Sequence, residues 1–177
     1  MNGNRRDIVK PIVVLTLICL VVSAALAFTN SLTKPVIDEA AAKRSDEIRL
    51  AVMPEADAFE QIEVPGMPET VSAAYRAKNG AGYVFNVVGR GYGGDMQIIC
   101  GIGPDGRITA CMTLSHSETE GVGSKTAEEE YRGQYAGKDA SLEGVEAISR
   151  ATVSSEAYEK AIRDVFEAYE AAKEAGR

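Results

Sequence analysis

The chain has 177 residues and a formal net charge of −7, charged residues make up 25% of it, and aliphatic residues are plentiful. The length allows one soluble domain together with a short additional segment. The composition excludes a disordered or low-complexity chain, and the acidic charge disfavours binding to nucleic acid. The cysteines and the single histidine form no metal-binding motif, so neither a structural zinc nor a protein-held iron–sulfur cluster is predicted (Cys19, Cys100, Cys111 and His116).

Residues 9–28 form an apolar run, VKPIVVLTLICLVVSAALAF, in which Lys10 is the only charge. At about 1.5 Å per residue, a helix of this length matches a hydrocarbon core of about 30 Å. A cleaved signal peptide is the alternative, because small residues stand near the end of the run. The apolar region of a signal peptide is usually only about 7–15 residues long, which favours a retained transmembrane helix.

Basic residues lead this span and acidic residues follow it. Arg5, Arg6 and Lys10 therefore predict a cytoplasmic N-terminus, residues 1–8, in a single-pass protein of the cell membrane. The same rule places residues from about 30 onward outside the cytoplasm.

Residues 29–69 are expected to form a stalk helix and a connector. Apolar residues after Pro35 fall on roughly one helix face, and three prolines then indicate an irregular connector with at most one short strand. These are Ile37, Ala41, Ile48 and Val52 on the helix, and Pro54, Pro65 and Pro68 in the connector. The folded domain, residues 70–177, follows.

Four runs between residues 71 and 114 predict antiparallel strands. Pro104, Asp105 and Gly106 suit a type I turn with a glycine bulge, which sets Gly103 opposite Arg107. In that register one apolar face carries Ile98, Cys100 and Ile102 on one strand and Met112, Ala110 and Ile108 on the next. Cys111 would point to the other face, so Cys100 and Cys111 are expected to stay unbridged.

Residues 155–173 predict an amphipathic helix that packs on this sheet, with Ser154 or Ser155 as the N-cap. Its apolar side consists of Tyr158, Ile162, Val165, Phe166 and Tyr169. The expected fold is therefore α+β: a transmembrane helix, an antiparallel sheet and a packed C-terminal helix.

Two polar segments fit neither the strands nor the helix. In residues 115–125, His116, Glu118 and Thr119 precede glycines that allow a ligand to approach the backbone, and an ordinary polar connection explains them as well. In residues 146–155, small and hydroxyl residues run into a helix N-terminus, which favours a phosphate. A plain N-cap explains these residues too.

Several stretches resemble the FMN-binding domain family that is shared by the G subunit of the Rnf complex and the C subunit of the sodium-pumping NADH:quinone reductase. ALAFTNSLTKPVI is similar to the junction after the family's span, and GYGGDMQIICGIGPDGRI to its glycine-rich hairpin. SHSETEGVGSK resembles its His-x-Glu-Thr-Pro-Gly-Leu-Gly segment, and EAISRAT its flavinylation motif, Asp-x-x-Ser-Gly-Ala-Thr. The resemblance covers nearly the whole chain.

The resemblance implies FMN esterified through its phosphate to Thr152 by a separate magnesium-dependent flavin transferase. It also implies that both polar segments contact the flavin, through Ser149, Arg150, Ala151, His116, Glu118, Thr119, Gly121 and Lys125. No side chain in this sequence can transfer electrons at useful potentials, so the isoalloxazine ring of the flavin would do the redox chemistry. Arg150 stands where the family has glycine, and arginine adopts the backbone angle of a glycine only at a cost. Its side chain either pairs with the phosphodiester or is solvated.

By this resemblance the chain is an electron relay of an Rnf complex that links reduced ferredoxin and NAD⁺ to the translocation of Na⁺ or H⁺. Other membrane subunits of the complex would be its partners. Three alternatives stay open: the C subunit of the NADH:quinone reductase, which is usually longer, a free-standing extracytoplasmic flavoprotein, and a scaffold in which Thr152 is only a cap.

Overall fold

The computed structural model describes residues 3–175 and divides into two compact units, Met1–Ser45 and Asp46–Arg177. Residues 1–2 and 176–177 lie outside the described part, as do the side chains of residues 3–9, 13, 31–32 and 35–43. The predictions that concern the side chains of Arg5, Arg6, Ile37 and Ala41 fall on these residues.

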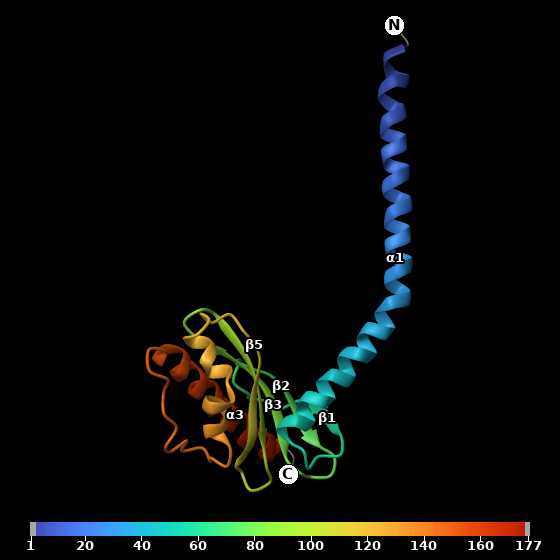
Figure 1. Ribbon diagram of the computed structural model, residues 1–177. Helices are drawn as coiled ribbons and strands as arrows, with labels where there is room; N and C mark the ends of the chain where they lie inside the picture. Colours follow the sequence, from blue (N-terminus) through green and yellow to red (C-terminus); the bar gives the residue numbers. More distant parts are fainter. Residues whose placement is uncertain (1–2, 176–177) are drawn as a thin grey trace. The chain divides into compact units, whose positions relative to one another are not determined.

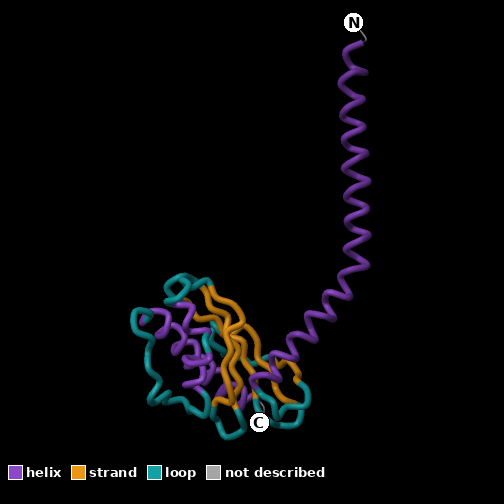
Figure 2. Tube along the Cα trace, in the orientation of Figure 1, coloured by secondary structure: helices purple, strands orange, loops and turns teal. Residues whose placement is uncertain are grey.

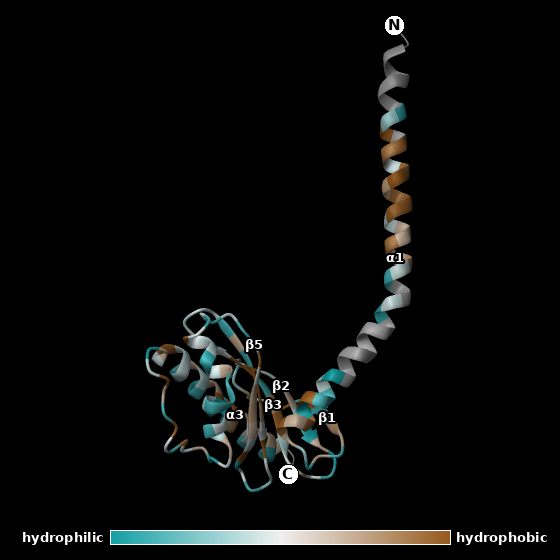
Figure 3. Cartoon of the chain, in the orientation of Figure 1, coloured by the Kyte–Doolittle hydropathy of each residue, from teal (hydrophilic) through white to brown (hydrophobic). Residues whose placement is uncertain are grey.

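The first unit belongs to one helix, α1 (Gly3–Val52), which also continues into the second unit. Within the described residues, one segment, Lys10–Asn30, is long and apolar enough to cross a membrane. The hydropathy colouring shows this segment as the brown part of α1 (Figure 3). The segment matches the predicted span, residues 9–28, to within two residues at each end, and span and stalk form one continuous helix.

The second unit contains a five-stranded antiparallel meander in the order β1-β2-β3-β4-β5. Figure 1 shows the sheet, and Figure 2 shows the short loops that join consecutive strands. The strands are β1 (Phe59–Ile62), β2 (Val71–Ala77), β3 (Tyr83–Arg90), β4 (Asp95–Ile102) and β5 (Ile108–His116). Because β1 pairs with β2, the compact unit begins before the boundary expected near Thr70.

The turn between β4 and β5 has the predicted form, but the predicted register holds only beside it. Gly103 N donates to Arg107 O over 2.8 Å, and Ile102 pairs with Ile108. A bulge then shifts the pairing by one residue, so that Cys100 lies opposite Cys111 instead of Ala110. The prediction that Cys100 and Cys111 point to opposite faces was therefore wrong.

The bulge leaves Thr109 unpaired on β5 and turns its hydroxyl toward the end of α1. Thr109 Oγ1 donates to the backbone oxygen of Val52 over 2.6 Å. Beyond the bulge, Ala110 and Met112 pack in the cluster of Val52 rather than on the face predicted for them. A contact with a segment 57 residues away thus accompanies the shift in register.

The sheet has an apolar cluster on each face. One face packs against α3 (Thr152–Ala175), whose predicted apolar residues are all buried (Tyr158, Ile162, Val165, Phe166 and Tyr169). The second cluster contains the end of α1 and alternate residues of the strands (Val52, Met53, Ala56, Ala77, Val84 and Ile99). The α+β class with an antiparallel sheet and a packed C-terminal helix is confirmed.

Between β5 and α3 the chain forms η1 (Gly123–Ala127), α2 (Glu129–Arg132) and η2 (Gly133–Tyr135). Helix α3 begins at Thr152, three residues before the predicted start. Ser154 and Ser155 lie inside its first turn, so neither is the N-cap. Their hydroxyls bond instead to groups outside the helix, Ser154 to Glu118 and Ser155 to the backbone nitrogen of Ile148.

Candidate functional site

A buried carboxylate, that of Glu118, joins three segments of the domain. Its Oε1 accepts a hydrogen bond from Gly93 N over 3.2 Å, and its Oε2 accepts one from Ser154 Oγ over 2.7 Å. Only 7% of the residue is exposed. Glu118 therefore links the turn between β3 and β4 to the first turn of α3.

Glycines make room for this carboxylate. A Cβ atom added at Gly91 would collide with Oε1, and one added at Gly123 would collide with Oε2. A Cβ atom added at Gly93 would collide with the backbone oxygen of Ser117. The glycine-rich turn and Gly123 of the 115–125 segment thus leave space for the same buried carboxylate.

The N-terminus of α3 is reached through a strained residue. Arg150 has φ +70°, in the left-handed region that favours glycine. Ala151 N then donates to Ile148 O over 3.0 Å, and the helix begins at Thr152. The first backbone amides of an α-helix have no acceptor inside the helix, so those of Thr152, Val153 and Ser154 are available to a ligand.

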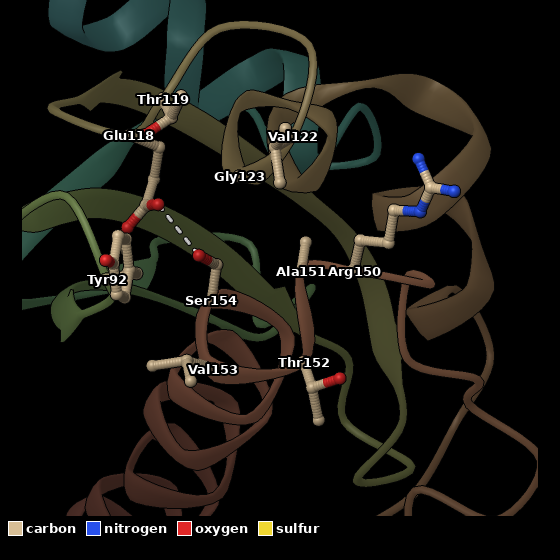
Figure 4. Close-up of a pocket in the computed structure, with 10 residues that line it drawn as sticks. All are labelled: Tyr92, Glu118, Thr119, Val122, Gly123, Arg150, Ala151, Thr152, Val153 and Ser154. Carbon is tan, nitrogen blue, oxygen red and sulfur yellow. Dashed lines mark hydrogen bonds between the residues drawn. The ribbon is translucent and has the colours of Figure 1, made fainter.

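A cavity of about 440 Å³ lies between these segments. This volume falls in the range of about 300–1,000 Å³ that is usual for small-molecule sites. Figure 4 shows the side chains around the cavity, with the bond between Glu118 and Ser154 dashed and the guanidinium of Arg150 extending away from Glu118. The lining consists of Tyr92, Glu118, Thr119, Val122, Gly123, Arg150, Ala151, Thr152, Val153 and Ser154.

Exposed apolar side chains gather at this cavity. The large hydrophobic residues exposed in the described part of the second unit are Leu50, Tyr92, Leu114, Val122 and Val153. Three of them, Tyr92, Val122 and Val153, line the cavity, and Tyr92 is 80% exposed. An apolar rim around a few polar groups is the usual construction of a site for an organic ligand. We call these three residues the apolar rim.

The cavity brings together five of the predicted site residues and leaves four outside. Glu118, Thr119, Arg150, Ala151 and Thr152 line it. The other four are His116, Gly121, Lys125 and Ser149. His116 pairs with Met96 at the end of β5 and leaves its Nδ1 buried without a hydrogen bond. Lys125 faces a second cavity with Glu128, Glu130 and Glu146, while Gly121 and Ser149 are exposed and border neither of these two cavities.

The sequence prediction missed the apolar rim and the polar role of Ser154. Tyr92 carried a local signal, since an aromatic residue between glycines in a turn has few neighbours to cover it. Val122 and Val153 carried none, because isolated valines next to polar residues are common in any connection.

Comparison with known proteins connects this site with flavoproteins. Residues 91–167, which include the whole cavity lining, match the family model of the FMN-binding domain. The G subunit of the ion-translocating oxidoreductase complex of Methanosarcina acetivorans is 32% identical to the chain over 180 residues, covering 93% of the chain and 96% of that protein.

Two further proteins are similar over most of their lengths. The G subunit of the Na⁺-translocating ferredoxin:NAD⁺ oxidoreductase complex of Acetobacterium woodii is 28% identical, covering 89% of each chain. The G subunit of the proton-translocating ferredoxin:NAD⁺ oxidoreductase complex of Clostridium ljungdahlii is 24% identical, covering 86% of each.

Proposed function

The chain belongs to the family of G subunits of ion-translocating oxidoreductase complexes, and from this premise we propose that it is an electron-transfer subunit of a ferredoxin:NAD⁺ oxidoreductase with FMN esterified to Thr152. The bound flavin supplies the one- and two-electron redox chemistry. The named relatives include a proton-translocating and a Na⁺-translocating complex, so the proposal covers either ion.

The position of Thr152 carries the proposal. Thr152 is exposed, is the first residue of α3 and lines the cavity. A phosphodiester on its hydroxyl would lie beside the free amides of the first helical turn, where a negative charge gains about 0.3–1 kcal/mol at an exposed site. This arrangement supports attachment at Thr152 rather than at Ser154, whose hydroxyl is buried and donates to Glu118.

Arg150 has a defined place in this proposal. Its positive φ sets the backbone that leads into α3, and its exposed guanidinium has no ion pair among the described residues. The side chain is therefore available to the phosphodiester, whose oxygens match the guanidinium fork. Ala151, which is buried beside it, fixes the position from which Thr152 emerges.

The apolar rim suits the flavin ring. Tyr92, Val122 and Val153 come from three different segments and offer apolar surface at one opening. With a flavin bound in the cavity, Tyr92 would be placed to pack against the isoalloxazine, because an exposed aromatic side chain would gain both buried area and ring stacking there. Thr119 also lines the cavity and would offer a hydroxyl to the polar edge of the flavin.

Membrane location and maturation complete the proposal. The segment Lys10–Asn30 would anchor the chain in the membrane, and the basic residues at its N-terminal end favour a location of the second unit outside the cytoplasm. By the family resemblance, a separate flavin transferase would attach the FMN there. Other subunits of the complex are the partners in electron transfer.

Peptide mass spectrometry tests the attachment. The full chain is produced together with a flavin transferase, and the peptide containing residues 151–160 should gain the mass of one FMN less one water. Thr152→Ala should remove the modification and keep the circular dichroism spectrum, while Thr152→Ser should retain part of it. An unmodified peptide in the unaltered chain, or covalent flavin in Thr152→Ala, would refute the proposed site.

A further inference from the structure

Two buried cysteines face each other across neighbouring strands. Cys100 on β4 and Cys111 on β5 are directly paired, and their Sγ atoms are 3.2 Å apart. Residues directly opposite in an antiparallel pair have Cα atoms about 4.5–5.5 Å apart. A disulfide requires about 4.4–6.8 Å, so the backbone already has the separation that the bond needs.

We propose that Cys100 and Cys111 are an oxidisable pair that closes a disulfide between β4 and β5. The proposal rests on the bulge at Thr109, because the bulge places both sulfurs on the same face. Without it Cys111 would point away from Cys100, as the sequence pattern predicted. The proposal does not depend on Thr152 or on a bound flavin.

The oxidant is a small disulfide, and the reaction is thiol–disulfide exchange. One cysteine loses its proton and attacks a sulfur of the oxidant, which forms a mixed disulfide and releases one thiol. The second cysteine then loses its proton and attacks the mixed disulfide, which forms the bond between Cys100 and Cys111 and releases the second thiol. The two protons end on the released thiols, and the two electrons lost by the pair reduce the oxidant.

The surroundings of the pair determine when the reaction takes place. Cys100 and Cys111 are 0% and 2% exposed and belong to the buried cluster that includes Tyr158 of α3. Burial raises the pKa of the Cys111 thiol well above its usual value, and the hydrogen bond with Cys100 is the second cause of this increase. Oxidation is therefore slow in the folded domain and fast before α3 covers the sheet, so the disulfide forms during folding.

The remaining cysteine belongs to the candidate membrane segment. Cys19 lies in the candidate membrane segment of α1, in the other compact unit. Disulfides persist on the oxidising side of a membrane, which agrees with the proposed location of the second unit. A disulfide there would close a short loop and hold the bulged pair of strands together.

Refolding of the full chain tests the pair directly. Cys19→Ala protein is unfolded in urea with reductant, transferred to oxidised and reduced glutathione in detergent, and alkylated under denaturing conditions. We expect a product that carries no alkyl group and is lighter by two hydrogen atoms than the reduced chain. A peptide linking Cys100 to Cys111 should appear after digestion without reductant.

Matched controls keep the test decisive. In Cys100→Ala and Cys111→Ala, the partner cysteine should be recovered either alkylated or as a mixed disulfide with glutathione, and oxidation should no longer raise the unfolding midpoint. The oxidised chain with both cysteines should melt about 5 °C or more above its reduced form. If both cysteines are alkylated after oxidative refolding, and also in protein quenched with acid directly from cells, the pair is not oxidisable and the proposal fails.

Discussion

Glu118 Oε2 accepts a hydrogen bond from Ser154 Oγ over 2.7 Å, across 36 positions of sequence. The bond places a carboxylate from the 115–125 segment against the first turn of α3, next to Thr152. The same carboxylate accepts a hydrogen bond from Gly93 N in the glycine-rich turn. The two polar segments that fitted neither strand nor helix in the sequence are therefore parts of one site.

Glu118→Ala should destabilise the domain. It leaves the buried hydroxyl of Ser154 without its acceptor, which costs about 1–3 kcal/mol, whereas water can replace the acceptor that the exposed Gly93 loses. Urea unfolding of the detergent-solubilised chain, followed by circular dichroism, measures the loss. Glu118→Gln keeps an acceptor and should lose less, and Glu120→Ala, at an exposed position, should lose almost nothing. Equal stability of Glu118→Ala and the unaltered chain would contradict the role of this carboxylate.

Thr119→Ala should leave the stability of the domain almost unchanged and should alter the bound flavin. Thr119 lines the cavity, is exposed, and its side chain has no hydrogen bond among the described residues. We expect a change in unfolding free energy within about 0.5 kcal/mol. The flavin-loaded chain should instead show a shifted absorbance spectrum or midpoint potential, because a hydroxyl next to the flavin is lost. An unchanged spectrum and potential would indicate that the loop beside Thr119 is only a connection.

Arg150→Gly should stabilise the domain. A left-handed backbone costs an L-residue about 1–2 kcal/mol, and the greater freedom of glycine in the unfolded chain offsets about 0.5–1 kcal/mol of the relief. The net gain in the free energy of unfolding should be up to about 1.5 kcal/mol in urea unfolding. Ser149→Gly is the matched control, since Ser149 has no positive φ, and it should lose stability. If Arg150→Gly lost as much unfolding free energy as Ser149→Gly, the guanidinium would contribute more to stability than the strained backbone costs.

Tyr92→Ala should brighten the bound flavin. A tyrosine stacked on isoalloxazine quenches its fluorescence, and Tyr92 is the exposed aromatic residue of the apolar rim. Fluorescence per covalently bound flavin should rise in Tyr92→Ala and rise less in Tyr92→Phe, which keeps a ring. Leu114→Ala, an exposed position outside the cavity lining, serves as the control. Equal fluorescence in all of these proteins would exclude the proposed stacking.

Reporter fusions test the orientation in the membrane. Because Arg5, Arg6 and Lys10 lead the span, a reporter that is active only in the cytoplasm should be inactive when fused after Arg177. The same reporter fused ahead of Met1 should be active, which controls for expression and insertion. Activity of the C-terminal fusion would reverse the proposed topology.

Local sequence patterns predicted most of the helices and strands, because each pattern lies within the residues of the element that it predicts. Alternating apolar residues identified β2 to β5, and the 3.6-residue period identified the buried side of α3. Pro104, Asp105 and Gly106 identified the turn before β5, where Gly106 has φ +79°. Each of these signals is contained within a few consecutive residues.

The errors arose where a distant segment decides the local structure. The bulge at Thr109 comes with a hydrogen bond to Val52, and the serines of α3 bond to groups outside the helix instead of capping it. Two residues of the 115–125 segment also face different cavities, as Thr119 and Lys125 do. Such contacts depend on the packing of the whole domain, which a local pattern does not contain.

The end of α1 determines where the second unit can be cut. Val52 and Met53 are 0% and 1% exposed, and they pack with Val84 and Ile99 on the sheet face opposite α3. A protein fragment that starts near Thr70 would lose these residues together with β1, leaving an apolar sheet face and an unpaired edge in water. Fragments for crystallisation or for flavinylation in vitro should therefore start near Asp46, and shorter ones should aggregate.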